Sequence, residues 1–132
     1  MARGKVELIR HGLDAFARRD LEAWRACFDS EVRVREDPSM PDAGEYVGHE
    51  GLMQWLYVME RNWDEFQVEG EEFIESGDEV VTLMRVRGRG RVSGADVDGR
   101  FGSIFTVREE RVVDWQIFAG WTAALEVAGL RE

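Results

Sequence analysis

Two adjacent carboxylates, Glu36 and Asp37, stand at the end of a predicted strand and directly before Pro38. A carboxylate at the mouth of an apolar pocket loses hydration, and a desolvated carboxylate is a good base for a proton beside a carbonyl group. The pair also has a simple structural interpretation, because Asp before Pro commonly opens a turn. We expect Glu36 to be the base if either residue acts, and Asp37 is the second candidate.

Four arginines alternate with other residues near the end of the segment 79–91 and therefore share one face of a predicted strand. Guanidinium groups bind carboxylates well, so Arg85 and Arg87 are candidates for an anion clamp beside a ligand cavity. The alternative is a strand end that projects into solvent, and we favour this interpretation for Arg89 and Arg91. For Arg85 and Arg87 both interpretations stay open.

Aromatic side chains recur on the apolar faces of the predicted elements, at Trp24, Trp55, Trp63, Phe101, Phe105 and Trp115. Most of them are expected to build a core, and some to wall a cavity for a flat apolar ligand. Ile104, Gln116 and Phe118 fall on the opposite face of their strands. An apolar residue such as Phe118 on that outer face predicts a homodimer interface.

Composition argues against several classes of partner. The 132 residues carry 17 Lys and Arg against 27 Asp and Glu, a formal net charge of −10, so neither nucleic acid nor an anionic membrane surface is expected to bind. His11, His49 and the single Cys27 have no metal-ligand spacing. We expect no metal, no cofactor, no membrane span and a cytoplasmic location.

The hydrophobic pattern predicts helices first and a meander of strands afterwards. Helices are expected over residues 3–18, after an N-cap at Asp20, and over 49–63. This order predicts one α+β domain over residues 1–132, with helices on one face of a curved, mostly antiparallel sheet that closes into a cone with room for a ligand. Strands are expected, with a bulge near Gly70, over residues 31–36, 46–48, 65–75, 79–91, 97–108 and 111–121.

Four stretches that together cover much of the chain resemble the SnoaL-like branch of the nuclear transport factor 2-like superfamily: AFARRDLEAWRACFDSEVRV, YVGHEGLMQWL, EVVTLMRVRGRGRVSG and FTVREERVVDWQIFAGWTAALEVAGL. The resemblance implies a cone-shaped barrel, with three helices from the N-terminal half on the concave face of the sheet. It also implies a homodimer through the outer face. It implies function only loosely, because the superfamily includes isomerases, cyclases, epoxide hydrolases, dehydratases and binding modules.

The catalytic positions of ketosteroid isomerases can be matched to this chain one at a time. The resemblance places the general base at Glu36, or at Asp37 with one inserted residue. It places the isomerase tyrosine at Gly12 and the protonated aspartate at Ser103, and neither residue supplies the strong donor that this chemistry needs. Gly12 lies inside a predicted helix, where it either enlarges the cavity or allows close packing of helices.

The chain also lacks catalytic residues of two further enzyme families. Arg85 matches the arginine of limonene epoxide hydrolases, but Arg87 and Ile117 occupy the two carboxylate positions, so nothing activates water. Polyketide cyclases use an acid on the late strands, and the nearest one, Asp114, is expected on the outer face.

The candidate ligand-contacting residues are Gly12, Trp55, Trp63, Arg85, Arg87, Phe101, Ser103, Trp115 and Ile117.

Two hypotheses about function follow. In the first, a small homodimeric protein binds an apolar, carbonyl-bearing metabolite in its cone and isomerises, cyclises or dehydrates it by proton transfer without a cofactor. In the second, the protein is a non-catalytic module that binds such a ligand or pairs with another protein. The missing oxyanion donors favour binding, and Glu36 keeps the enzymatic hypothesis open.

Overall fold

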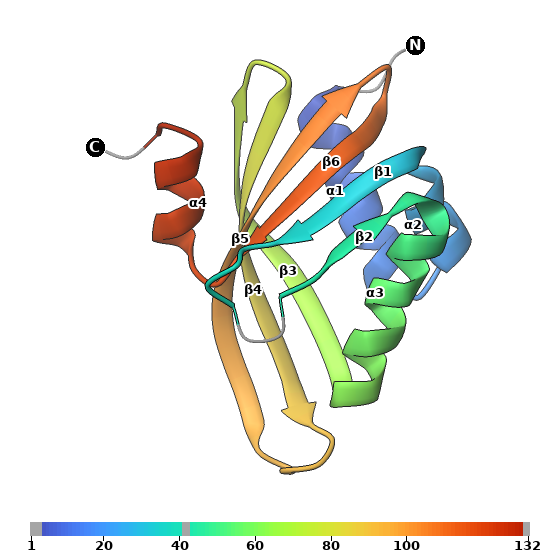
Figure 1. Cartoon of the computed structure of the whole chain (residues 1–132), viewed down its shortest axis with the longest axis vertical. Helices are drawn as coiled ribbons and strands as arrows, with labels where there is room; N and C mark the ends of the chain where they lie inside the picture. The colour runs from blue at the N-terminus through green and yellow to red at the C-terminus, as the bar shows by residue number, and fades with distance from the viewer. Residues whose placement is uncertain (1–3, 41–42, 131–132) are drawn as a thin grey trace.

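The computed structural model describes residues 4–40 and 43–130, and within them it contains four helices and six strands (Figure 1). The predicted start of the first helix, at residue 3, lies outside the described residues. The helices are α1 (Lys5–Ala17), α2 (Leu21–Ala26), α3 (Gly48–Asn62) and α4 (Trp121–Val127). The strands are β1 (Phe28–Glu36), β2 (Glu45–Val47), β3 (Trp63–Ser76), β4 (Glu79–Gly90), β5 (Asp96–Arg108) and β6 (Arg111–Phe118).

The strands form one sheet in the order β2-β1-β6-β5-β4-β3. Within the described residues β1 and β6 run parallel, and the other neighbouring strands are antiparallel. The helices α1, α2 and α3 lie on the concave side of the curved sheet, whereas α4 lies on its other side (Figure 1). The predicted α+β class, the mostly antiparallel sheet and the three helices on its concave face are confirmed.

Local sequence patterns explain how this core forms. α1 turns Leu8 and Phe16 toward the sheet, as expected for one face of an amphipathic helix. The strand β1 buries alternate residues, among them Val34. The predicted N-cap of α2 is confirmed, because the Asp20 side chain accepts a hydrogen bond from the Ala23 N–H at 3.2 Å.

The edge strand β3 contains two register shifts against β4. One lies between Gly70 and Glu72 and confirms the predicted bulge. A Cβ atom at Gly70 would come within 2.4 Å of the Phe73 ring and 3.0 Å of Leu13, so a larger residue at this bulge would require these side chains to shift. The second shift lies between Asp64 and Gln67, where Glu65 has a left-handed backbone with φ of 54°. Bulges bend a strand and increase its twist, so both shifts curve this edge of the sheet.

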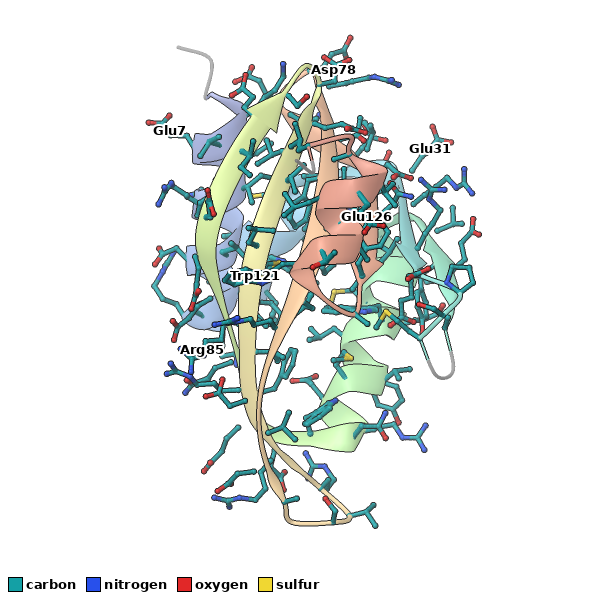
Figure 2. All side chains as sticks on the ribbon, turned by 90° about the vertical axis from the view of Figure 1, so that its left-hand side faces the viewer. Glu7, Glu31, Asp78, Arg85, Trp121 and Glu126 are labelled. Atoms are coloured by element: carbon teal, nitrogen blue, oxygen red, sulfur yellow. The ribbon has the colours of Figure 1, made fainter. Side chains whose placement is uncertain are left out.

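The last strand is shorter than the sequence indicates. β6 ends at Phe118 instead of continuing to residue 121, and α4 begins after Gly120. This helix packs on the convex face of the sheet, where Trp121 Nε1 donates a hydrogen bond to the carbonyl oxygen of Met84 at 2.9 Å. Figure 2 looks at this side of the sheet, with α4 in front of the strands. Ala124 of α4 packs there in a second apolar cluster with Val81, Leu83, Ile104 and Phe118 of the sheet.

The covering helix corrects one prediction. Ile104 is 1% exposed and Phe118 is 5% exposed, because α4 of the same chain lies over both. Their apolar character is therefore explained without a second protomer, and these two residues cannot form an exposed interface. Gln116, the third residue of the predicted interface, is half-buried beside them.

The tight turn between β5 and β6 consists of Glu109 and Glu110, with φ values of 49° and 63°. A left-handed backbone at both central residues is the geometry of a type I′ hairpin turn, which Asn and Gly favour. Glutamates are poor residues for such a turn, so the local sequence does not indicate it. None of the helices within the described ranges is long and apolar enough to span a membrane.

Candidate functional site

Aromatic rings from five elements meet on the concave side of the sheet. Trp24 of α2 lies 5.1 Å from Phe16 of α1 and 6.2 Å from Trp55 of α3, measured between ring centroids. Trp115 of β6 lies 4.8 Å from Trp55 and is stacked on Phe105 of β5 at 5.4 Å. Aromatic pairs of this kind contribute about 0.5–1.5 kcal/mol beyond the area they bury, so the cluster stabilises the fold.

A cavity of about 30 Å³ lies inside this cluster. That volume holds roughly two water-sized spheres, so a larger ligand must displace side chains to enter. Leu13, Val68 and Phe101 are the lining residues that are only half-buried, and movement is easiest there. The predicted ligand contacts Trp55, Phe101 and Trp115 all line this cavity.

Trp55 carries a buried hydrogen-bond donor, Nε1, that has no partner among the described residues. The residue is 5% exposed and its side chain lines the cavity. A buried N–H without a partner costs about 1–3 kcal/mol, and most protein interiors avoid it. Trp115 shows the ordinary arrangement, because its Nε1 donates to Ser103 Oγ at 2.9 Å. Thr82 Oγ1 is also without a partner, but it does not line the cavity.

A wider open groove of about 930 Å³ lies where the C-terminal end of α1 meets the bulged start of β3 and the neighbouring ends of β4 and β5. Phe16 and Val68 line both the groove and the aromatic cavity, so these two side chains form the wall between them. Small-molecule sites usually have volumes of roughly 300–1,000 Å³. The groove is large enough for such a molecule, and the cavity extends it into the core.

Ion pairs surround the apolar floor of this groove. Arg87 Nη1 lies 3.6 Å from Glu69 Oε1, and Arg89 Nη2 lies 3.8 Å from Glu65 Oε2. All four side chains are largely exposed, so these pairs contribute little to stability. They form a polar rim in which each of these positive charges already has a negative neighbour.

Glu36 lies at the end of β1, with its side chain on the concave side according to the alternation from Val32 and Val34. Its Oε1 accepts a hydrogen bond from the Gly44 N–H at 3.0 Å. Burial raises the pKa of Glu36 above its ordinary value, and the bond from Gly44 opposes that rise. Burial, and then the negative charge of Glu36, also raise the pKa of Tyr46.

Glu36 does not line the aromatic cavity. Its partner in the sheet is Ile117, two residues beyond Trp115, which is about 7 Å further along β6. Glu36 instead lines a separate surface depression of about 470 Å³, together with Pro38 and Met40 of the segment that follows β1. The aromatic cavity and the predicted base are therefore separate sites in this structure.

A model of the SnoaL-like domain matches residues 9–115. The chain belongs to this family. The matched segment runs from α1 to β6 and includes the aromatic cluster, the groove and Glu36. No curated protein matches this SnoaL-like chain.

Solved structures share the fold over nearly the whole chain. An NTF2-like protein from Burkholderia thailandensis has a TM-score of 0.81 at 21% identity, with 98% of each chain covered. An NTF2-like protein of unknown function from Burkholderia pseudomallei has a TM-score of 0.79 at 23% identity, covering 92% of this chain and 94% of that one. TerC, crystallised with polyporic acid, has a TM-score of 0.78 at 21% identity, covering 94% and 97%. At these identities the likeness shows the fold alone.

Arg85 and Arg87 lie on the convex face of the SnoaL-like sheet, which favours the solvent-facing interpretation over an anion clamp that faces the cone. Along β4 the even-numbered residues, such as Val86, face the concave core, and the odd-numbered ones therefore face outward. Arg85 donates two hydrogen bonds of 2.7 Å to Asp98. The bond from Arg85 lowers the pKa of Asp98. Arg87 reaches the groove only from its outer rim.

Asp37 has the structural role that its position before proline indicates. Its carboxylate accepts a hydrogen bond of 2.6 Å from Ser39 Oγ, and its N–H donates to the carbonyl of Ile117 at 2.8 Å. It lines neither the aromatic cavity nor the groove. The structure therefore favours the turn over catalysis for Asp37.

Four other predicted contacts do not line the aromatic cavity, namely Ser103, Ile117, Trp63 and Gly12. Ser103 is fully buried, accepts the hydrogen bond from the Trp115 indole and lies 3.1 Å from Met84 Sδ, so it positions Trp115. Ile117 is buried in the core, and Trp63 is half-buried against Phe66.

Gly12 shows features of both interpretations given for it, an enlarged cavity and close packing of helices. It lines a separate cavity of only about 20 Å³, and a Cβ atom there would lie 3.5 Å from Cys27 Sγ, an ordinary contact. The missing side chain thus leaves a very small space against Cys27, and it does not open a large one. Within the described residues no cluster of His, Cys, Asp or Glu could hold a metal ion.

Sequence reasoning missed Phe16, Val68, Arg19 and Tyr46 as site residues. Phe16 and Val68 are apolar residues of predicted elements, but nothing in the sequence indicates that the end of α1 packs against β3. Tyr46 was assigned to a short strand without regard to Glu36. The register of β2 on β1, in which Tyr46 pairs with Val34, brings the tyrosine close to that carboxylate.

Proposed function

We propose that this SnoaL-like protein binds a small, flat, apolar molecule that carries a carbonyl group. The ligand lies in the groove and inserts its apolar end past Phe16 and Val68 into the aromatic cavity. The observation that carries the proposal is Trp55 Nε1 in the wall of that cavity, a buried donor for which the described part of the chain offers no acceptor. A carbonyl oxygen is the acceptor that this donor lacks.

Physical chemistry supports this class of ligand. Each Å² of apolar surface that leaves water contributes about 25 cal/mol, and flat rings match the aromatic walls. The indole N–H then selects for an acceptor at the inner end, because an apolar ligand alone would leave it unpaired. The related fold of TerC with polyporic acid supports including that compound among the first ligands tested.

The proposal predicts that replacing Trp55 by Phe weakens binding of a carbonyl ligand. Flat ketones, lactones, quinones and polyporic acid are screened by quenching of tryptophan fluorescence, and the affinity of the best ligand is measured by calorimetry. Trp55→Phe keeps an aromatic ring and removes the donor, so affinity should fall about 5-fold, the effect of a neutral hydrogen bond of about 1 kcal/mol.

The matched control is Trp121→Phe, on the opposite face of the sheet. It also removes an indole N–H, yet it belongs to α4 and lines neither cavity nor groove. Its affinity for the ligand should equal that of the parent chain. Saturable binding by no member of the panel, in a well-folded protein, would reject the proposed function.

Proton transfer by Glu36 is a second candidate function. It is favoured by the raised pKa of this half-buried carboxyl and by Tyr46 beside it, a second group able to hold or move a proton. The separation of Glu36 from the aromatic cavity requires the ligand to reach across Ile117. We therefore rank ligand binding first and proton transfer second.

A further inference from the structure

Arg19 differs from the other charged residues of the groove. It stands between α1 and α2, and its Nη2 donates a hydrogen bond to the carbonyl oxygen of Phe66 on β3. Its guanidinium carbon also lies 5.0 Å from the centroid of the Phe16 ring, within cation–π range. These two contacts hold the guanidinium at the apolar floor of the groove, beside the entrance to the aromatic cavity.

The positive charge of Arg19 has no carboxylate partner within 4.0 Å among the described residues. Arg87 and Arg89, which line the same groove, are each within 4.0 Å of a glutamate. The adjacent Arg18, which does not line the groove, donates to Asp14 at 3.1 Å. Of the three arginines that line the groove, Arg19 is therefore the one without a carboxylate neighbour among the described residues.

The end of α1 directs Arg19 toward β3. Arg19 follows the helix and has a φ of 61°; its N–H donates to the carbonyl of Phe16 at 3.0 Å, and the Asp20 N–H donates to the carbonyl of Ala15 at 2.9 Å. These two bonds form a Schellman motif, in which the residue after the helix ordinarily has a left-handed backbone. The helix end therefore places Arg19 where its side chain reaches the Phe66 carbonyl of β3.

We propose that Arg19 binds the carboxylate or enolate of the ligand, so that the ligand class is a flat apolar acid. The inference rests on the proposed function and adds the charge of the ligand to it. The anionic end meets Arg19 at the groove, and the apolar body covers Phe16 on the way to Trp55. Within residues 4–40 and 43–130, Nη2 is the one nitrogen of Arg19 with a hydrogen-bond acceptor, so its other N–H groups are available for such an anion.

A matched pair of ligands tests this inference. 6-Acetyl-2-naphthoic acid and 6-acetyl-2-naphthamide have nearly the same shape, and both carry a ketone at the end opposite the acid or amide group, but only the acid is charged at neutral pH. Calorimetry on the intact protein should show that the acid binds at least 10-fold more tightly than the amide, because hydrogen bonds to charged groups are about twice as strong as neutral ones. The acid's affinity should also fall as salt is added.

Variants of two adjacent arginines test whether Arg19 causes the tighter binding of the acid. Arg19→Asn removes the charge with a residue that tolerates left-handed backbone, and it should weaken binding of the acid at least 10-fold while leaving the amide unchanged. The control Arg18→Asn removes a neighbouring charge that does not line the groove, and it should change neither affinity.

The outcomes separate this inference from the proposed function. Equal affinity for acid and amide in the parent chain would overturn the role of Arg19 and leave ligand binding intact. An acid preference that survives in Arg19→Asn would also overturn it, by assigning the anion to another residue. Binding of neither compound, nor of any ligand in the larger panel, would reject both proposals together. The comparison of ligands in the parent chain stays valid even where a variant fails to fold.

Discussion

Glu36 is a carboxyl group whose charged form is disfavoured by its surroundings. Burial raises its pKa, and the single backbone N–H of Gly44 only partly compensates. A carboxyl with a raised pKa in the folded state binds protons more tightly there than in the unfolded chain. Its contribution to stability is therefore present below the unfolded pKa, near 4.5, and is lost as the pH rises through the folded value.

Glu36→Gln should accordingly raise the midpoint of thermal unfolding at pH 7 and leave it nearly unchanged at pH 4. The glutamine keeps an oxygen that can accept the Gly44 N–H, and it has no charge to desolvate. Thermal unfolding measured between pH 4 and pH 8 checks this. The neighbouring Asp37→Asn is the control, and it should lower the midpoint or leave it unchanged because it weakens the bond from Ser39.

Once a ligand is known, Glu36→Gln also tests whether Glu36 transfers protons. If Glu36 is a base, the protons beside the ligand carbonyl exchange with heavy water in the parent protein and do so at least 100-fold more slowly in Glu36→Gln. Equal exchange rates in the two proteins would remove Glu36 as a base. A loss of stability at pH 7 on Glu36→Gln would contradict the raised pKa itself.

At the scale of elements, α4 decides what the convex face of the sheet does. Its close approach depends on Gly102 of β5, because a Cβ there would come 2.4 Å from the Ala124 Cβ and 3.0 Å from the carbonyl oxygen of Gly120. No real Cβ contact is that short, so either the helix or the strand would have to shift. The apolar patch beneath α4 includes Ile104 and Phe118, so a shift would expose it.

We therefore expect Gly102→Ala to destabilise the protein by about 1–3 kcal/mol, the usual effect of overpacking a well-packed interface. Gly99→Ala on the same strand is the control, since its nearest neighbour beyond the adjoining residues would be Val86 Cγ1 at 3.9 Å. That control should stay within about 0.5 kcal/mol of the parent. Urea unfolding of both variants measures the difference, and equal stabilities would show that α4 does not pack as described.

At the scale of the whole molecule, the homodimer implied by the family resemblance remains a prediction. The part of the convex face that α4 leaves open carries ion pairs, including Arg35 with Asp114 at 2.9 Å, beside the half-buried Gln116. An interface there would be polar, unlike the apolar one that Ile104 and Phe118 first indicated. We expect dimers held by this strip of β1 and β6.

Light scattering after size exclusion should give a mass of twice 15.2 kDa at micromolar concentration. Gln116→Arg places another positive charge beside Arg35 and its symmetry mate, so it should raise the dissociation constant at least 10-fold. Gln54→Arg on the exposed side of α3 makes the same change of residue type away from the strip, and it should leave the mass unchanged. A monomeric mass for the parent chain would contradict the prediction of a homodimer.

Much of the fold could be predicted because it follows from local patterns. The helical spacing of apolar residues located α1 and α3, the Asp20 side chain located the start of α2, and the break in alternation located the bulge at Gly70. Three of the predicted ligand contacts, Trp55, Phe101 and Trp115, do line the aromatic cavity. These inferences depend only on residues close together in the chain.

The sequence by itself determined the α+β class, the faces of the helices and the acidic charge of this protein. Only the tertiary structure decided that β4 is buried on both faces between Val80 and Met84, because the helix that covers its convex face, α4, lies far along the chain. It also decided that Glu36 is apart from the aromatic cavity and that Trp55 Nε1 has no partner among the described residues. Alternation determines which residues share a face, whereas burial of that face depends on elements that pack on it from elsewhere.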